Sequence, residues 1–218
     1  MSTSPVAGPT RTSVRSWSVL LGVLLAGLVA DLWSKSAAFE RVADVPVEVR
    51  REQVMRTEQL GRLIPPHEPV IVVPNILEFT LVLNPGAVFG LGAGKRLLFI
   101  GFTLVAVVMG LWMFLTWTTR RDWLAHASLG LLLSGGLGNL YDRVKFACVR
   151  DFIHPLPGVR IAGREIWPYV SNVADAFLIV GIIGLMWHLW RSDSGPPSAE
   201  AAEPGRDQPN DGAVAEAG

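Results

Sequence analysis

Four apolar stretches of about 20 residues each limit what this chain can fold into. An α-helix of about 20 residues crosses the ~30 Å hydrocarbon core of a bilayer at about 1.5 Å per residue. Half of the 218 residues are apolar and 17% are charged, a composition typical of a small integral membrane protein. We therefore expect an α-helical membrane protein with four transmembrane helices, at residues 17–36, 97–117, 123–141 and 169–190.

Tryptophan and arginine mark the ends of these stretches. All eight tryptophans lie at or near the ends of the expected spans, where indole rings prefer the headgroup level. Five arginines flank the spans on one side: Arg11, Arg15, Arg120, Arg121 and Arg191. By the positive-inside rule this predicts that both termini are cytoplasmic, although the loop at residues 142–165 also carries five basic residues.

The first span has two alternative interpretations. Arg11 and Arg15 precede an apolar run, as in a cleaved signal peptide, but the run continues past any convincing cleavage site, which favours a retained helix. Cys148 is the single cysteine, so no disulfide can form within the chain, and we interpret it as a small buried apolar residue.

The segments outside the spans predict a small extracytoplasmic β-sheet and an interfacial helix. Residues 38–94 form a long outer segment, whose charged part at 40–62 is rich in helix formers and predicts a surface or interfacial helix. β-Branched and aromatic runs at 70–73 and 77–83 predict two short strands, and 159–161 in a second outer loop (142–168) predicts another. We expect residues 1–16 and the Pro-, Gly- and acid-rich tail at 191–218 to be disordered cytoplasmic segments.

Two aspartates accompany the last two spans. Asp151 closely follows the third span and Asp175 lies inside the fourth. A carboxylate at membrane depth costs about 2.5–3.5 kcal/mol even on the insertion scale, so such a residue is by default a candidate functional group. Two carboxylates held close together share one proton, which suits acid–base chemistry.

Five short motifs place these aspartates in a wider pattern. They are DLWSK at 31–35, NPGAVFG at 84–90, GGLGNLYDRV at 135–144, VRDF at 149–152 and NVAD at 172–175. In their order and their places relative to the four spans, these motifs resemble those of the bacterial lipoprotein signal peptidases, also called signal peptidase II. The chain departs from that family at Ser171, where phenylalanine is usual, and in a longer segment between Lys35 and Asn84.

The resemblance implies an aspartic endopeptidase of the bacterial inner membrane, with its active site at the periplasmic face. It would remove the signal peptide from prolipoproteins, cutting just before a cysteine already modified with diacylglycerol. Asp151 and Asp175 would be the catalytic pair, one taking a proton from water while the other donates to the scissile carbonyl oxygen. The resemblance implies no metal and no cofactor. We expect lipid-modified prolipoproteins and membrane phospholipids as partners, no nucleic acid, and a monomer.

Further motif residues are candidates for binding substrate or supporting the pair. Asn139 and Arg143 lie four apart and would share one helix face, as would Asn172 and Asp175. Arg143 has two interpretations: it binds substrate carbonyls or braces the outer loops, or it pairs with a carboxylate or reaches the headgroups. Asn172 is placed to orient the pair or a substrate peptide.

The remaining candidates lie in the first two motifs. Asn84 and Gly86 would shape a turn near the cleft, with glycine permitting a φ that a side chain forbids. Asp31 and Lys35, at i and i+4, would form an ion pair that fixes the first span, with direct substrate contact as the alternative. His154 lies three residues after Asp151, but no second histidine stands at ligand spacing, so we expect no metal site.

Two other classes of function are compatible with membrane spans. A transporter or channel also places aspartates in its helices, but usually has more spans or inverted repeats, and the sequence has no internal repeat. A lipid-binding scaffold accounts for the apolar spans but not for the ordered polar motifs.

Overall fold

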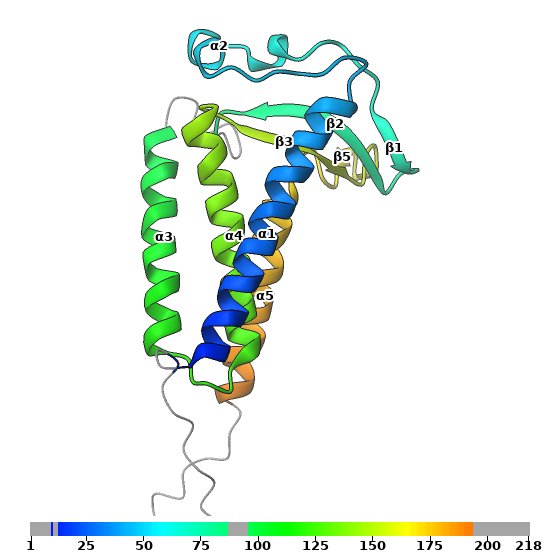
Figure 1. Cartoon of the computed structure of the whole chain (residues 1–218). Coiled ribbons are helices and arrows are strands. Elements are labelled where there is room, and N and C mark those ends of the chain that lie inside the picture. The colour runs from blue at the N-terminus through cyan, green and yellow to red at the C-terminus, as the bar shows by residue number, and fades with distance from the viewer. Residues whose placement is uncertain (1–9, 11–12, 87–95, 194–218) are drawn as a thin grey trace, which may run out of the picture.

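A computed structural model describes residue 10, residues 13–86 and residues 96–193. Four long helices lie side by side, and a small sheet with an extended arm covers one end of the bundle (Figure 1). The helices are α1 (Val14–Arg41), α3 (Arg96–Thr116), α4 (Trp123–Lys145) and α5 (Val173–Asp193). α4 packs against each of the other three, so it is the central helix of the bundle.

Three of the four helices meet the length and composition of a membrane span. These are α1, α3 and α5, and α4 is not among them. Its 23 residues include buried small and polar side chains, among them Ser128, Ser134 and Asn139, which face the neighbouring helices. A helix surrounded by protein does not need a lipid-facing apolar surface, which explains its lower hydropathy. The expectation of a helix at 123–141 is confirmed, whereas its crossing of a membrane stays a prediction.

The ends of the first and last helices differ from the expected ends. α1 begins at Val14, after Ser13 accepts a hydrogen bond from the backbone N–H of Ser16 at 3.2 Å, and it continues to Arg41 rather than residue 36. Residues 14–16 and 191–193, expected to be disordered, are therefore helical, because α5 runs from Val173 to Asp193 rather than over 169–190. Residues 10 and 13 are also described. The remaining residues for which we expected disorder, at 1–9, 11–12 and 194–218, lie outside the described residues.

The sheet has three antiparallel strands in the order β1, β2, β3. β1 (Val70–Val73) and β2 (Leu77–Asn84) match the two strands predicted from sequence, and β3 (Val149–Pro155) completes the sheet. The strand expected near 159–161 does not join this sheet, because β4 (Arg160–Ile161) pairs with β5 (Arg164–Glu165) in a separate hairpin. β3 escaped prediction because its first four residues are buried on both faces and show no alternation of polar and apolar side chains.

An outer arm, residues 42–69, connects α1 to β1. The helix expected in the charged segment at 40–62 is confirmed only in part, because the arm is helical at α2 (Arg51–Arg56) and in a 3-10 turn, η2 (Leu60–Leu63), and not over the rest of its length. Pro46 explains the interruption, since a proline disfavours helical geometry in the residue before it. The arm therefore runs largely in extended form across the top of the bundle (Figure 1).

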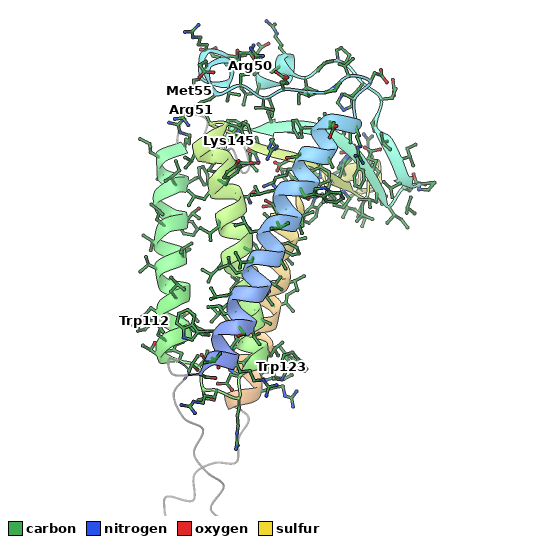
Figure 2. All side chains as sticks on the ribbon, in the orientation of Figure 1. Arg50, Arg51, Met55, Trp112, Trp123 and Lys145 are labelled. Carbon is green, nitrogen blue, oxygen red and sulfur yellow. The ribbon has the colours of Figure 1, made fainter. Side chains whose placement is uncertain are left out.

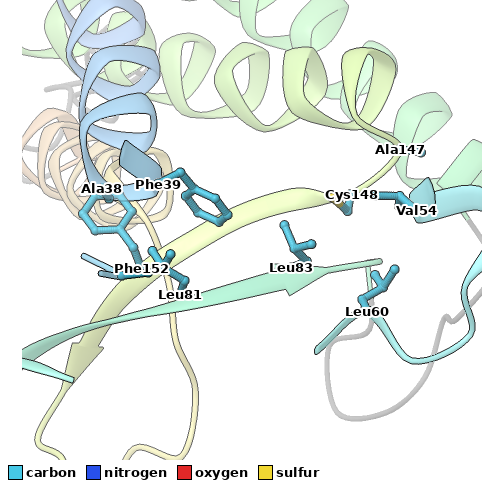
Figure 3. Close-up of a cluster of buried hydrophobic side chains, with 10 residues drawn as sticks. Ala38, Phe39, Val54, Leu60, Leu81, Leu83, Ala147, Cys148 and Phe152 are labelled. Atoms are coloured by element: carbon cyan, nitrogen blue, oxygen red, sulfur yellow. The ribbon is translucent and has the colours of Figure 1, made fainter. Parts of the chain in front are cut away.

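Apolar and polar contacts hold this arm against the bundle. A cluster of buried apolar side chains combines residues of α1, the arm, β2 and β3, including Phe39, Leu60 and Phe152 (Figure 3). Arg51 donates to the carbonyl of Val144 at the end of α4, near Met55 and Lys145 (Figure 2). Trp112 and Trp123 lie at the opposite end of the bundle, as expected for tryptophans that mark span ends (Figure 2).

The close approach of α4 to α5 generates a test with a matched control. A Cβ at Gly135 would lie 2.5 Å from the carbonyl oxygen of Ala174, whereas a Cβ at Gly136 meets nothing closer than 3.6 Å. We expect Gly135→Ala to destabilise the protein by about 1–3 kcal/mol, because α5 must move away. Gly136→Ala should leave the unfolding midpoint in detergent near that of wild type. Equal midpoints for the two variants would contradict this packing.

Candidate active site

The two aspartates lie at the end of the bundle that the sheet covers. Asp151 comes from β3 and is 1% exposed, while Asp175 is in the first turn of α5 and is partly exposed. Burial, with a smaller contribution from the negative charge of Asp175, raises the pKa of Asp151 from its ordinary 3.8 to about 7. Hydrogen bonds from Asn172 and Asn84, and the charge of Lys35, oppose this rise without cancelling it.

Asn172 contacts both carboxylates. It directly precedes α5, where its Oδ1 accepts from the backbone N–H of Asp175 at 3.1 Å and its own N–H donates to Asp175 Oδ2 at 3.2 Å. This reciprocal pair has the form of a capping box and fixes the Asp175 side chain at the helix start. Asn172 Nδ2 also donates to Asp151 Oδ1 at 2.6 Å. The Asn172 side chain thus connects the two aspartates.

Each aspartate receives a further hydrogen bond from an asparagine amide. Asn84 Nδ2 donates to Asp151 Oδ2 at 3.0 Å, and Asn139 Nδ2 donates to Asp175 Oδ1 at 2.8 Å. Asn84 reaches Asp151 because β2 pairs with β3 in a register that places Val82 opposite Asp151.

The turn predicted at Asn84 and Gly86 is also present. Gly86 has a φ of +100° and donates its N–H to Asn84 Oδ1 at 2.9 Å. A Cβ at Gly86 would lie 2.9 Å from the ring of Phe99, so both the backbone and the space require glycine. The last four residues of this motif, 87–90, lie outside the described residues.

A buried ionic network lies beside the pair. The predicted Asp31–Lys35 ion pair is confirmed, with Lys35 Nζ 2.9 Å from Asp31 Oδ2 and both side chains fully buried. Lys35 also lies 3.5 Å from Asp142 Oδ2 and donates to Asn139 Oδ1 at 2.9 Å. Asp31 Oδ1 accepts the backbone N–H of Ala174 at 2.9 Å, which ties α1 to the first turn of α5.

Arg143 shares the α4 face of Asn139, as the spacing predicted. Its Nη1 donates to the backbone carbonyl of Asn139 at 3.3 Å, and its guanidinium stacks 5.2 Å from the centre of the Phe99 ring. No ion pair to a carboxylate is found for it among the described residues. Its Nε is buried and has no hydrogen-bond partner within the part of the chain that the structure describes.

Sequence reasoning missed the role of Asp142 and Arg150. Arg150 donates from Nη2 to Asp142 Oδ1 at 2.9 Å and from its backbone N–H to Asp142 Oδ2 at 3.1 Å, and both residues are buried. The signal was available, because both lie inside quoted motifs and carry opposite charges. Their separation of eight residues does not by itself predict a contact. The contact depends on the turn at Ala147, where φ is +65°.

The other reactive side chains near the pair have structural partners. His154 lies three residues along β3 from Asp151, an odd spacing that points it to the opposite face, where Nδ1 meets Glu78 Oε1 at 2.8 Å. Burial raises the pKa of the Cys148 thiol to about 12, so it is not a nucleophile at neutral pH. Within the described residues, no group of three His, Cys, Asp or Glu side chains could hold a metal ion.

Comparison with solved structures defines the class of fold. Two bacterial membrane enzymes share this fold: one has a TM-score of 0.60 and 22% identity over 90% of this chain and 99% of its own. The other has a TM-score of 0.55 and 23% identity over 78% of this chain and 91% of its own. At these identities the likeness shows the fold alone, a bundle of four long helices with a small sheet at one end.

Comparison with sequences then identifies the family. Residues 23–191 match the Peptidase_A8 family, signal peptidase (SPase) II. The lipoprotein signal peptidase of Desulfitobacterium hafniense is 39% identical over 119 residues, which are 55% of this chain and 72% of that protein. That of Moorella thermoacetica is 38% identical over 124 residues, which are 57% of this chain and 75% of that protein. The chain belongs to the signal peptidase II family and is a protease.

The raised pKa of Asp151 predicts how its removal changes stability with pH. The folded protein holds this proton more tightly than the unfolded chain, so the group stabilises fully below about pH 3.8 and loses this effect as pH rises to about 7. Asp151→Asn stays neutral throughout. We expect its unfolding midpoint, relative to wild type, to rise between pH 5 and pH 8 in detergent. Exposed Asp44→Asn is the control, and a pH-independent difference for Asp151→Asn would contradict the assignment.

Proposed function

We propose that this protein is a membrane aspartic endopeptidase that cleaves diacylglyceryl-modified prolipoproteins just before the lipid-modified cysteine. Family membership supports signal-peptide removal from prolipoproteins. One observation carries the choice of catalytic pair: a single residue, Asn172, donates to both carboxylates, from its side chain to Asp151 and from its backbone N–H to Asp175.

The burial of the two carboxylates suggests separate roles. Asp151 is almost fully buried and its pKa is raised, so it holds the shared proton and acts as the acid. Asp175 is partly exposed, so water can reach it, and it acts as the base. It takes a proton from water, the resulting hydroxide attacks the scissile carbonyl, and Asp151 protonates the carbonyl oxygen. As this tetrahedral adduct collapses, Asp175 passes the proton that it took from water to the leaving nitrogen, Asp151 regains its proton from a hydroxyl of the adduct, and the peptide C–N bond breaks.

The surroundings of the pair supply places for the substrate chain. A cavity of about 670 Å³ opens beside Pro85, directly after Asn84, and is lined by Met55 of the arm and Arg96 of α3. Arg143, with its buried unpartnered Nε, is positioned to bind a substrate carbonyl.

The apolar helices suggest how the protein lies in the membrane. We propose that α4 crosses the bilayer with α1, α3 and α5, that both termini are cytoplasmic, and that the pair lies at the outer face of the inner membrane. Exposed apolar side chains cover α3, including Phe102, Val105 and Val108, as suits a helix in contact with lipid. The substrate's alkyl chains would stay among the phospholipids while its scissile bond reaches the pair. The enzyme acts as a monomer in this proposal.

Loss of either carboxylate should abolish cleavage without unfolding the protein. We expect Asp151→Asn and Asp175→Asn each to lower the cleavage rate by about 10²–10⁴-fold or more, because the acid or the base is lost. The measurement is a gel-shift assay in detergent micelles with a diacylglyceryl-modified prolipoprotein, with Asp44→Asn as the control.

The outcomes separate the candidate functions. Cleavage that survives either substitution excludes this pair as the catalytic group. A folded wild-type protein that does not cleave this substrate contradicts the proposed activity and favours transport or a scaffold role.

The pH dependence of cleavage should report the proton of Asp151. As pH rises through about 7, Asp151 loses that proton and the pair loses its acid. We expect kcat/KM to fall about tenfold per pH unit above this point, because the protonated fraction falls by that factor. A profile that stays flat from pH 6 to pH 9 would show that the acid is a different group.

A further inference from the structure

A chain of hydrogen bonds connects Lys35 of α1 to the catalytic pair. Lys35 Nζ donates to Asn139 Oδ1 at 2.9 Å, and Asn139 Nδ2 donates to Asp175 Oδ1 at 2.8 Å. Asn139 Oδ1 also accepts from Asn172 Nδ2 at 3.1 Å, and Asn172 Nδ2 donates to Asp151. The buried ammonium is therefore two hydrogen bonds from Asp175.

The chemistry of these groups fixes the direction of every bond in this chain. An ammonium group donates and cannot accept, so the oxygen of Asn139, and not its NH₂ group, must face Lys35. The NH₂ group of Asn139 is then directed to Asp175. Asn139 Oδ1 accepts one hydrogen bond from Lys35 and a second from the NH₂ group of Asn172. The same NH₂ group of Asn172 donates to Asp151. Rotation of the Asn139 amide by 180° would put N–H groups against Lys35 and an oxygen against Asp175.

We propose that Lys35 is a positioning residue that sets the hydrogen-bond polarity of the active site. By occupying the oxygen of Asn139, it makes both asparagine amides donate to the aspartates. Donation of this kind favours the ionised carboxylate that the base requires. This inference rests on the proposed function of Asp151 and Asp175. It assigns Lys35 a role in catalysis without contact with substrate.

A purely structural role for Lys35 does not account for these contacts. Structural pairing accounts for the contacts of Lys35 with Asp31 and Asp142, but not for its hydrogen bond to the neutral amide of Asn139. Replacing a buried ion pair by apolar residues is often neutral for stability, so stability alone gives little reason for a buried lysine. The bond from Lys35 to the neutral amide of Asn139 orients the amide that donates to Asp175, whatever the Asp31–Lys35 ion pair contributes to stability.

The charge of Lys35 also acts on the acid of the pair. The charged and titratable groups that face Asp151 are Asp175 of α5, Arg143 of α4, Lys35 of α1 and the Cys148 thiol before β3. Lys35 lowers the pKa of Asp151, against the larger effect of burial. Removal of Lys35 therefore raises that pKa and moves the alkaline limb of the rate profile to higher pH. The shift of the limb reports the charge of Lys35, and the fall in kcat reports its hydrogen bond to Asn139.

The experiment compares kcat, KM and the alkaline limb in wild type and Lys35→Met. We expect kcat to fall about 10–100-fold with KM within about twofold, as for other residues that orient a catalytic group, and the limb to move upward. Lys35→Met leaves Asp31 buried without its partner and can therefore fail to fold. The second variant is Asp31→Asn/Lys35→Met, which removes both charges. The amide oxygen at position 31 can still accept from the backbone N–H of Ala174. Exposed Lys145→Met on α4 is the matched control and should behave as wild type.

A double-mutant cycle tests whether Lys35 acts through Asn139. In an Asn139→Leu background, the further loss from Lys35→Met should be within about twofold, because the bond that transmits the effect is already absent. An equal fold-loss in both backgrounds would overturn the inference, as would a folded Lys35→Met protein with wild-type kcat and an unmoved limb. If Asp151→Asn or Asp175→Asn still cleaves, the proposed function itself fails. If both are inactive while Lys35→Met matches wild type, only this inference fails.

Discussion

The buried ion pairs beside the active site are the interactions on which the rest of the structure depends. Lys35 and Asp31 of α1 meet Asp142 of α4, and Arg150 of β3 binds the same Asp142. Asp31 in turn holds the first turn of α5. Four elements, α1, α4, β3 and α5, are thus joined around two cations and two carboxylates. Removing one partner of such a pair costs about 3–5 kcal/mol, so these contacts leave little freedom in how the four elements meet.

This fixed arrangement explains why neutral asparagines, and not charged groups, contact the aspartates. A lysine or arginine paired directly with Asp151 or Asp175 would favour the charged form so strongly that sharing a proton would become difficult. Amide groups donate hydrogen bonds without adding charge, so the pair keeps the ability to lose and regain a proton. The cations act on the aspartates without direct hydrogen bonds to them. Lys35 acts through Asn139, and Arg143 acts through its charge.

Local sequence patterns predicted the parts of the site that depend on local geometry. The Asp31–Lys35 pair follows from the i, i+4 spacing, and the turn at Gly86 follows from a motif within one short segment. The third strand and its register against β2 depend on which distant segments meet, and the Asp142–Arg150 pair depends on the turn at Ala147, so neither followed from local patterns. Hydropathy likewise located α4, but its central position among the other helices follows from packing that a single sequence does not reveal.

Charge balance at the covered end of the bundle connects stability with activity. The charged groups that interact with the pair or with the ionic network beside it are three cations and four carboxyl groups, namely Lys35, Arg143, Arg150, Asp31, Asp142, Asp151 and Asp175. One shared proton on the pair makes this set neutral, and its loss near pH 7 leaves one uncompensated negative charge in a buried site. The state with one proton is also the state in which one carboxyl can donate while the other accepts. The protonation state that suits catalysis is therefore the one that costs least to bury.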